Sequence, residues 1–189
     1  MELSRAKKYI ILDISANVQI VILSTKDTII SIKKKTFKQD FVSGMIPLIS
    51  EILNENKLIL KDVSGIIVGS GPGSYIGSRL AVLTSKILAL ELNIPLYQIS
   101  SLLLLSSGYE YKILTPKIYA KKNFFYSLSL DNNKIVLSEN IYAQDFLNNF
   151  DNNILLDESN FKISLEKIFF YMKKVLNPSV LIPTYYTHY

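Results

Sequence analysis

The stretch GSGPGSYIGSR, residues Gly69 to Arg79, decides how the chain is organised. It follows the apolar run Ile66–Val68, precedes a long helical pattern, and holds four of the seven glycines in the 189-residue chain. A strand, a glycine turn and a helix N-terminus can form an anion site, because free backbone N–H groups point outward there. The same arrangement lets a helix pack very close to a sheet or to another helix. The sequence therefore leaves two interpretations, an anion-binding loop or a packing turn.

The helical pattern after this turn runs from about Ser74 to Leu92 and ends at Asn93, with Pro95 beyond it. One side of the expected helix carries a line of large apolar residues: Ile76, Leu80, Leu83, Ile87 and Leu90. A second line, spaced four apart, holds only small residues: Gly77, Ala81, Ser85 and Ala89. Small residues in such a row allow another backbone to approach closely. That backbone belongs either to the chain's own core or to a partner protein.

The residues before the turn predict a strand meander followed by a helix. The expected strands are 8–13, 18–24, 28–33 and 65–68, of which the first two form a hairpin over a short, small link. Apolar residues at helical spacing predict a helix over 40–54, and Pro47 inside it should kink it. After Gly108 the pattern changes to expected strands 112–120, 124–130, 134–137 and 154–156, with helices 143–149 and 165–176. We therefore expect a first unit over residues 1–108 and a second over 109–189.

The composition argues against several kinds of site. The chain has no cysteine, so thiolate metal sites, disulfides and cysteine nucleophiles are excluded. The single histidine, His188, is next to last, a poor position for a zinc ligand or a catalytic base. We expect no catalytic residue, no metal site and no cofactor. No apolar run approaches the ~20 residues of a membrane span, so we expect a soluble, cytoplasmic protein with no membrane partner.

The chain is basic, with a net charge of +5 that comes almost wholly from lysine. Local clusters lie at Lys33–Lys35 with Lys38, at Lys121–Lys122 and at Lys173–Lys174, and arginine occurs only at Arg5 and Arg79. Solvated surface lysine is one interpretation of these clusters. A weak, sequence-independent attraction to nucleic acid is the other.

The order of elements around the glycine turn resembles the TsaB family, bacterial partner proteins in the threonylcarbamoyl-adenosine modification of tRNA. The family signature is G-x-G-P-G-S-aromatic-T-G-x-R. The residues that fit it in order are Gly69, Gly71, Pro72, Gly73, Ser74, Tyr75, Gly77 and Arg79. Ile76 stands where the family usually has Thr. Asp13 with Ser15 resembles the family's opening D-T-S, and the likeness is strong over residues 8–105 and weak beyond them.

This resemblance implies an α/β fold of the actin/Hsp70 type (ASKHA, RNase H-like), a mixed sheet flanked by helices, with a reduced second lobe. It also implies a TsaD-like catalytic paralogue as partner, with a homodimer and a TsaE-like ATPase as further associations and tRNA reached through the complex. The first-lobe helices of the two proteins are expected to pack into a shared bundle. The interface residues expected on this basis are Phe41, Gly44, Met45, Leu48, Gly77, Ser78, Ala81, Ser85 and Ala89.

The residues favour a scaffold over an enzyme. A nucleotide site in this fold needs glycines in the first hairpin and in the C-terminal half. The link Ile14–Asn17 has none, and no glycine follows Gly108. The turn also fits neither the P-loop nor the dinucleotide spacing. The alternatives are a metal-dependent, glycoprotease-like hydrolase and a module that binds tRNA directly. We expect Asp13 to be structural, and Arg79 to pair with a carboxylate of this chain or with an acidic group of a partner.

Overall fold

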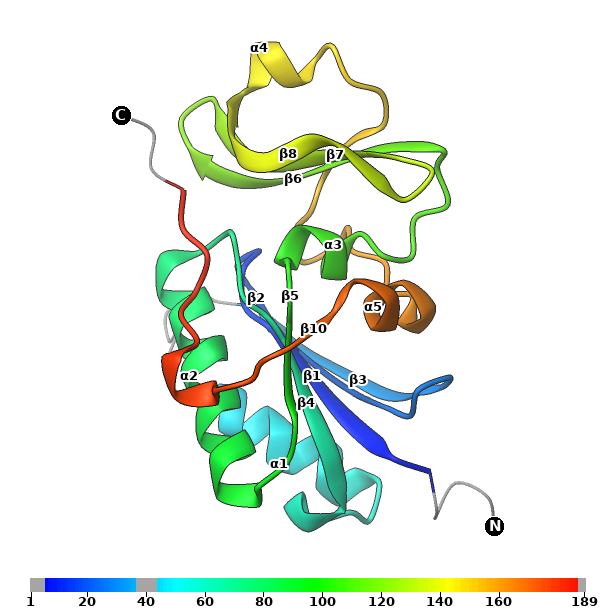
Figure 1. Ribbon diagram of the computed structural model, residues 1–189, viewed down its shortest axis with the longest axis vertical. Helices are drawn as coiled ribbons and strands as arrows, with labels where there is room; N and C mark the ends of the chain where they lie inside the picture. The colour runs from blue at the N-terminus through cyan, green and yellow to red at the C-terminus, as the bar shows by residue number, and fades with distance from the viewer. Residues whose placement is uncertain (1–5, 37–43, 187–189) are drawn as a thin grey trace.

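The computed structural model describes residues 6–36 and 44–186, which form two sheets with helices packed around them (Figure 1). The helices are α1 (Met45–Glu55), α2 (Tyr75–Leu92), α3 (Ser101–Leu105), α4 (Gln144–Leu147) and α5 (Leu165–Tyr171), with short 3-10 turns η1 (Leu60–Asp62) and η2 (Pro178–Val180). The strands are β1 (Lys8–Asp13), β2 (Val18–Ser24), β3 (Ile29–Thr36), β4 (Val63–Gly69), β5 (Leu96–Ile99), β6 (Ile113–Lys121), β7 (Phe124–Asp131), β8 (Lys134–Ala143), β9 (Asn153–Leu155) and β10 (Lys173–Lys174).

The first sheet is mixed and has the order β10-β5-β4-β1-β2-β3. β1, β2 and β3 form an antiparallel meander, whereas β4 runs parallel to both β1 and β5. The second sheet has the order β8-β7-β6-β9. This mixed α/β architecture agrees with the actin-like fold that the family resemblance implies.

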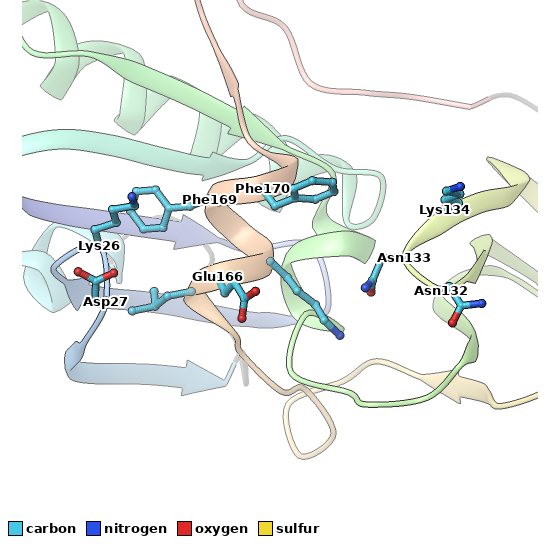
Figure 2. Close-up of a pocket in the computed structure, with 10 residues that line it drawn as sticks. Lys26, Asp27, Asn132, Asn133, Lys134, Glu166, Phe169 and Phe170 are labelled. Atoms are coloured by element: carbon cyan, nitrogen blue, oxygen red, sulfur yellow. The ribbon is translucent and has the colours of Figure 1, made fainter.

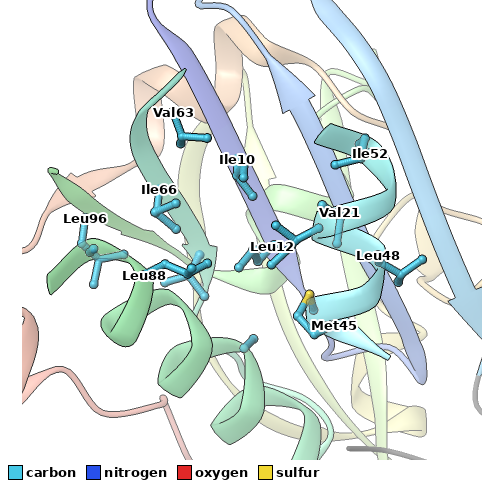
Figure 3. Packing of buried hydrophobic residues seen from close by; sticks show 14 of the residues in the cluster. Ile10, Leu12, Val21, Met45, Leu48, Ile52, Val63, Ile66, Leu88 and Leu96 are labelled. Atoms are coloured by element: carbon cyan, nitrogen blue, oxygen red, sulfur yellow. The ribbon is translucent and has the colours of Figure 1, made fainter. Parts of the chain in front are cut away.

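Strand β1 shows how both faces of the first sheet are buried. Ile10 and Leu12 point to one face and Ile11 to the other, as the two-residue period of a strand requires, and all three are at most 1% exposed. α1 and α2 cover the first face, where Met45, Ile52 and Leu88 pack on the strands (Figure 3). α3, α5 and the second sheet cover the other face.

Pro47 does not kink α1. The helix begins at Met45, so Pro47 lies in its first turn, where its missing N–H would have had no partner inside the helix. The predicted start of this helix, including Phe41, lies outside the described residues.

The chain returns to the first sheet after building the second. α5 contacts α3, β10 pairs with β5, and η2 packs on α2. The C-terminal segment, red in Figure 1, then runs along α2. The division into 1–108 and 109–189 stays a prediction, and the structure adds that α5, β10 and η2 lie against the first sheet.

Glu139 on β8 links the second sheet to the first. Its carboxylate accepts hydrogen bonds from the hydroxyl of Ser100, which precedes α3, and from the hydroxyl of Tyr186 in the C-terminal segment, the latter at 3.1 Å. Burial raises the pKa of Glu139 although both hydrogen bonds oppose the shift. One side chain therefore joins three parts of the chain.

Candidate functional site

The glycine turn between β4 and α2 is built for close approach to the chain's own backbone. A Cβ at Gly77 would lie 2.1 Å from the carbonyl oxygen of Ile14, and one at Gly73 would lie 2.5 Å from that of Ser15. Gly71 has a φ of 94°, which favours glycine, and its bond to Pro72 is cis. The glycines clear room for the loop between β1 and β2.

The same loop and α3 use several backbone N–H groups of the turn. Ser74 N–H donates to the carbonyl oxygen of Ser15 at 2.8 Å, and Gly71 N–H donates to Ser101 Oγ at 3.0 Å. Gly77 N–H donates to Ser74 Oγ at 3.2 Å, so Ser74 caps α2. Donors engaged in this way cannot also wrap a phosphate, so the geometry favours the packing interpretation of the turn.

Asp13 lies at the centre of these contacts. It is 1% exposed and accepts hydrogen bonds from Ser15 N–H at 2.8 Å, from Ser15 Oγ at 2.6 Å and from Ser101 Oγ at 2.5 Å. Burial raises the pKa of Asp13, and the three hydrogen bonds oppose that shift. A Cβ at Gly69 would lie 1.9 Å from Asp13 Oδ2. Asp13 therefore fastens the end of β1, the loop that follows it and α3 together, and it lies close against Gly69 at the end of β4.

The small-residue row of α2 faces the chain's own core. The interface residues expected from the sequence that lie buried are Gly44, Met45, Leu48, Gly77, Ser78, Ala81, Ser85 and Ala89. Ala81 and Ser85 are both 0% exposed, because small side chains let α2 approach the sheet. In the isolated chain these side chains therefore face the core, and their assignment as partner contacts stays a prediction. Phe41 lies outside the described residues.

The large residues of α2 lie on its opposite side. Ile76, Leu83, Ile87 and Leu90 are 52–54% exposed, and Leu80 between them is partly buried. We call these five residues the α2 stripe. Their steps along the chain are four, three, four and three, which is the spacing of a seam between two packed helices. Contiguous exposed apolar surface of this kind is typical of an interaction site.

Arg79 lies beside the α2 stripe and contacts two tyrosines. The guanidinium carbon is 4.0 Å from the centre of the Tyr75 ring, and Nε donates to Tyr185 Oη at 3.0 Å. Within the described residues, its contacts are therefore with aromatic rings rather than with a carboxylate of this chain. Of the two predictions for Arg79, an acidic group of a partner stays open.

The lysine cluster on β3 is largely occupied. Lys33 Nζ lies 2.7 Å from a carboxylate oxygen of Glu51 and 2.6 Å from one of Glu55, which ties β3 to α1. Lys34 Nζ donates to the carbonyl oxygen of Glu158 at 3.1 Å. These contacts weaken the interpretation of the cluster as a nucleic-acid site.

The sequence analysis did not predict that the C-terminal segment packs on α2 and is hydrogen-bonded to it. Lys86 Nζ donates to the carbonyl oxygens of Ser179 and Leu181 at 2.7 and 3.1 Å. Thr184 N–H donates to the carbonyl oxygen of Ser70 at 2.8 Å. Leu181 is buried in the core beneath α2. The available signal was weak, the three-residue apolar run Val180–Ile182 in a segment bounded by prolines.

Two of the larger hollows lie at the junction of the sheets. One, of about 910 Å³, is lined by the exposed Phe170 of α5, by Lys26 of the β2–β3 turn and by Lys134 of β8 (Figure 2). The other, of about 740 Å³, lies between the glycine turn at Ser74 and Tyr119 of β6. Within residues 6–36 and 44–186, no group of three or more His, Asp or Glu side chains is placed to hold a metal ion.

None of the described helices has both the length and the apolar character needed to cross a bilayer.

Comparison with known proteins defines the class of this fold. Residues 32–149 match the sequence profile of the family TsaD: tRNA N6-adenosine threonylcarbamoyltransferase. Two solved structures share the fold. They are an uncharacterized protein with similarity to the peptidase YeaZ, from Pseudomonas aeruginosa (TM-score 0.73, 17% identity, covering 96% of this chain and 100% of that one), and YeaZ from the same organism (TM-score 0.71, 18% identity, covering 95% and 99%).

Comparison with curated relatives narrows the family assignment. The TsaB tRNA threonylcarbamoyladenosine biosynthesis proteins of Bacillus subtilis and of Buchnera aphidicola from Schizaphis graminum are 35% and 28% identical over 43% and 77% of this chain. The aligned segments cover 36% and 63% of those two proteins, so the chain spans less than two thirds of their length. The chain belongs to the TsaD family, as a member of its TsaB branch.

Proposed function

We propose that this chain is a non-catalytic scaffold in the threonylcarbamoyl-adenosine modification of tRNA. It binds a TsaD-like protein through the exposed side of α2, and that partner transfers the threonylcarbamoyl group. The chain acts where tRNA is modified, in the cytoplasm, and reaches tRNA through the complex. A TsaE-like ATPase is a further component of the proposed assembly.

The observation that carries this proposal is the α2 stripe. Four of its side chains are more than half exposed, although each is large and apolar. Burying one such side chain is worth about 1.5–3 kcal/mol, so a partner helix seated on the stripe gains considerable free energy. The seven-residue spacing matches a helix as the occupant better than a strand or a small ligand.

The glycine turn supports a scaffold rather than a nucleotide-using enzyme. Its N–H groups at Gly71, Ser74 and Gly77 are engaged within the chain. Asp13 is likewise committed to serine donors, whereas a catalytic carboxylate needs access to a substrate.

The test replaces two exposed residues of the stripe, Leu83→Glu and Ile87→Glu, in one variant. We expect the fold to persist, because both side chains face solvent, and binding of the TsaD protein from the same organism to fall by more than about a hundredfold, since two carboxylates would be buried unpaired. Binding is measured by isothermal titration calorimetry and folding by circular dichroism.

The matched control is Val136→Glu, which places a carboxylate at another exposed apolar position, on β8. It should bind the TsaD protein as the wild type does. A double variant that binds normally would refute the proposal that α2 is the docking surface.

A further inference from the structure

Arg79 is held in place before any partner arrives. Tyr75 lies against one face of its guanidinium, and Tyr185 accepts a hydrogen bond from Nε. The two tyrosine rings also contact each other, with centroids 5.2 Å apart. A side chain fixed in this way has already lost much of the rotamer freedom that binding would otherwise remove.

The hydrogen bond to Tyr185 uses one of the five N–H donors of the guanidinium. A carboxylate is the acceptor that suits the remaining donors best, because its two oxygens match the geometry of the guanidinium fork. Arg79 is exposed, so such an acceptor can reach it from outside the chain.

Arg79 occupies a position that controls pairing between helices. It directly precedes Leu80 of the α2 stripe, as Lys86 directly precedes Ile87 one repeat later. Both cations therefore flank the same edge of the stripe. In paired helices, residues that flank the apolar seam face each other across it and determine which partners are accepted.

A second copy of α2 offers no anion to Arg79. In an antiparallel pair in which Leu80 of one copy packs against Leu83 of the other, Arg79 lies opposite Lys86, and the like charges repel. In a parallel pair, the facing position is Thr84, which is neutral. The carboxylate of α2, Glu91, flanks the other edge of the stripe.

The carboxylates of α1 do not change this result. Glu51 and Glu55 both lie within 2.7 Å of Lys33 on β3, on the side of the first sheet away from β4 and β5, on which α2 packs. Self-pairing through the stripe therefore gives Arg79 no anion. Arg79 meets Lys86 in an antiparallel pair and Thr84 in a parallel one, where Lys86 rather than Arg79 faces the carboxylate of Glu91.

We infer that Arg79 selects a different protein over a second copy of this chain. The preferred occupant of the α2 stripe is a helix of a heterologous partner with an aspartate or glutamate opposite Arg79. This inference rests on the proposed function and adds the charge that the partner must present.

The experiment reverses the charge with Arg79→Glu and measures two dissociation constants at 0.15 M NaCl. The first, for the TsaD protein from the same organism, should rise about tenfold or more, because a carboxylate would then face a carboxylate. The second, for self-association by analytical ultracentrifugation, should fall, because the introduced carboxylate of one copy would face Lys86 of the other. The loss of TsaD binding should shrink at 1 M NaCl.

Lys134→Glu is the matched control, since it makes the same change in net charge on β8, away from α2. It should change both constants by less than about twofold. Equal effects of the two substitutions, or self-association that Arg79→Glu does not strengthen, would overturn the inference. Absence of any complex between wild-type chain and TsaD protein would instead refute the proposed function, and self-association would still decide the role of Arg79.

Discussion

At the scale of single residues, the turn before α2 depends on glycines, which carry no side chain, and on the buried carboxylate of Asp13. Glycine is required where a Cβ would strike the β1–β2 loop, and Asp13 is required to join three segments. Both features concern how close two backbones can lie. Each leads to a prediction about stability.

The substitution Gly77→Ala should destabilise the fold. Alanine is favoured over glycine inside a helix by about 1 kcal/mol. Its Cβ, however, would lie 2.1 Å from the carbonyl oxygen of Ile14, a backbone atom that cannot rotate away. We expect a net loss of about 1–3 kcal/mol in the free energy of unfolding, measured by urea denaturation. A stabilised variant would show that α2 is not packed against this loop.

Asp13 should make stability depend on pH. Burial raises the pKa of Asp13 above its ordinary value of 3.8, so the folded state binds the proton more tightly than the unfolded state does. The stabilisation is complete below the unfolded pKa and is lost as the pH rises through the folded pKa.

The substitution Asp13→Asn should therefore give a flatter dependence of unfolding free energy on pH above 4, as measured by urea denaturation at a series of pH values. The amide still accepts from Ser15 N–H and can donate to Ser101 Oγ, so the variant should fold. Curves of equal slope for wild type and variant would contradict this account.

At the scale of elements, α2 has two apolar sides with opposite roles. Its small residues let it lie close to the sheet, and its large residues are left outward. The C-terminal segment secures α2 through Leu181, which is 7% exposed, whereas the next residue, Ile182, is 74% exposed.

This pair of neighbours gives a matched test. Leu181→Ala should lower the free energy of unfolding by about 2–3 kcal/mol, because it leaves a cavity in the core beneath α2. Ile182→Ala should change it by less than about 0.5 kcal/mol, as is usual at the surface. Both are measured by chemical denaturation. Equal effects would mean that the C-terminal segment does not pack as described.

The sequence predicts the regular elements near the turn well. β1, β2 and α2 follow clear periods and begin or end at marked residues, such as Asn93, whose left-handed backbone ends α2. The two-residue β10 is too short to produce a period, so only its pairing with β5 defines it.

The candidate interface shows a limit of sequence patterns. The spacing assigned the residues of α2 to two lines correctly, but it could not tell which line faces inward. Large apolar residues usually fill the core, and Val82 and Leu88 of α2 do so here, but Ala81 and Ser85 are buried beside them where α2 lies closest to the sheet. An apolar stripe that a partner protein covers has the same kinds of residues as a stripe that packs in the core, so composition does not distinguish the two.

At the scale of the whole molecule, Glu139 connects the two sheets and the C-terminal segment. Its effect is visible at Tyr186, whose pKa is raised to about 12 by burial first, and then by the charge of Glu139 and the hydrogen bond to it. The hydrogen bonds of Glu139 link the two sheets and so limit the motion of one sheet relative to the other.

Glu139→Gln should lower the pKa of Tyr186 while leaving it above 10, because the amide removes the charge but not the burial. The titration is followed by 13C NMR of tyrosine-labelled protein, with Tyr186→Phe used to assign the resonance. A pKa that stays near 12 in the variant would show that Glu139 does not bind Tyr186 in solution.

The pairing of β10 with β5 has a consequence during synthesis. β5 pairs with β4 along one edge, but the partner of its other edge arrives only with Lys173 and Lys174, after the entire second sheet has been translated. Until then, the nascent chain presents an uncovered strand edge, which is a template for pairing with other chains. Nascent chains in which Lys173 and Lys174 have not yet emerged from the ribosome should therefore be the ones that need a chaperone, and the emergence of β10 is the step that closes this edge of the first sheet.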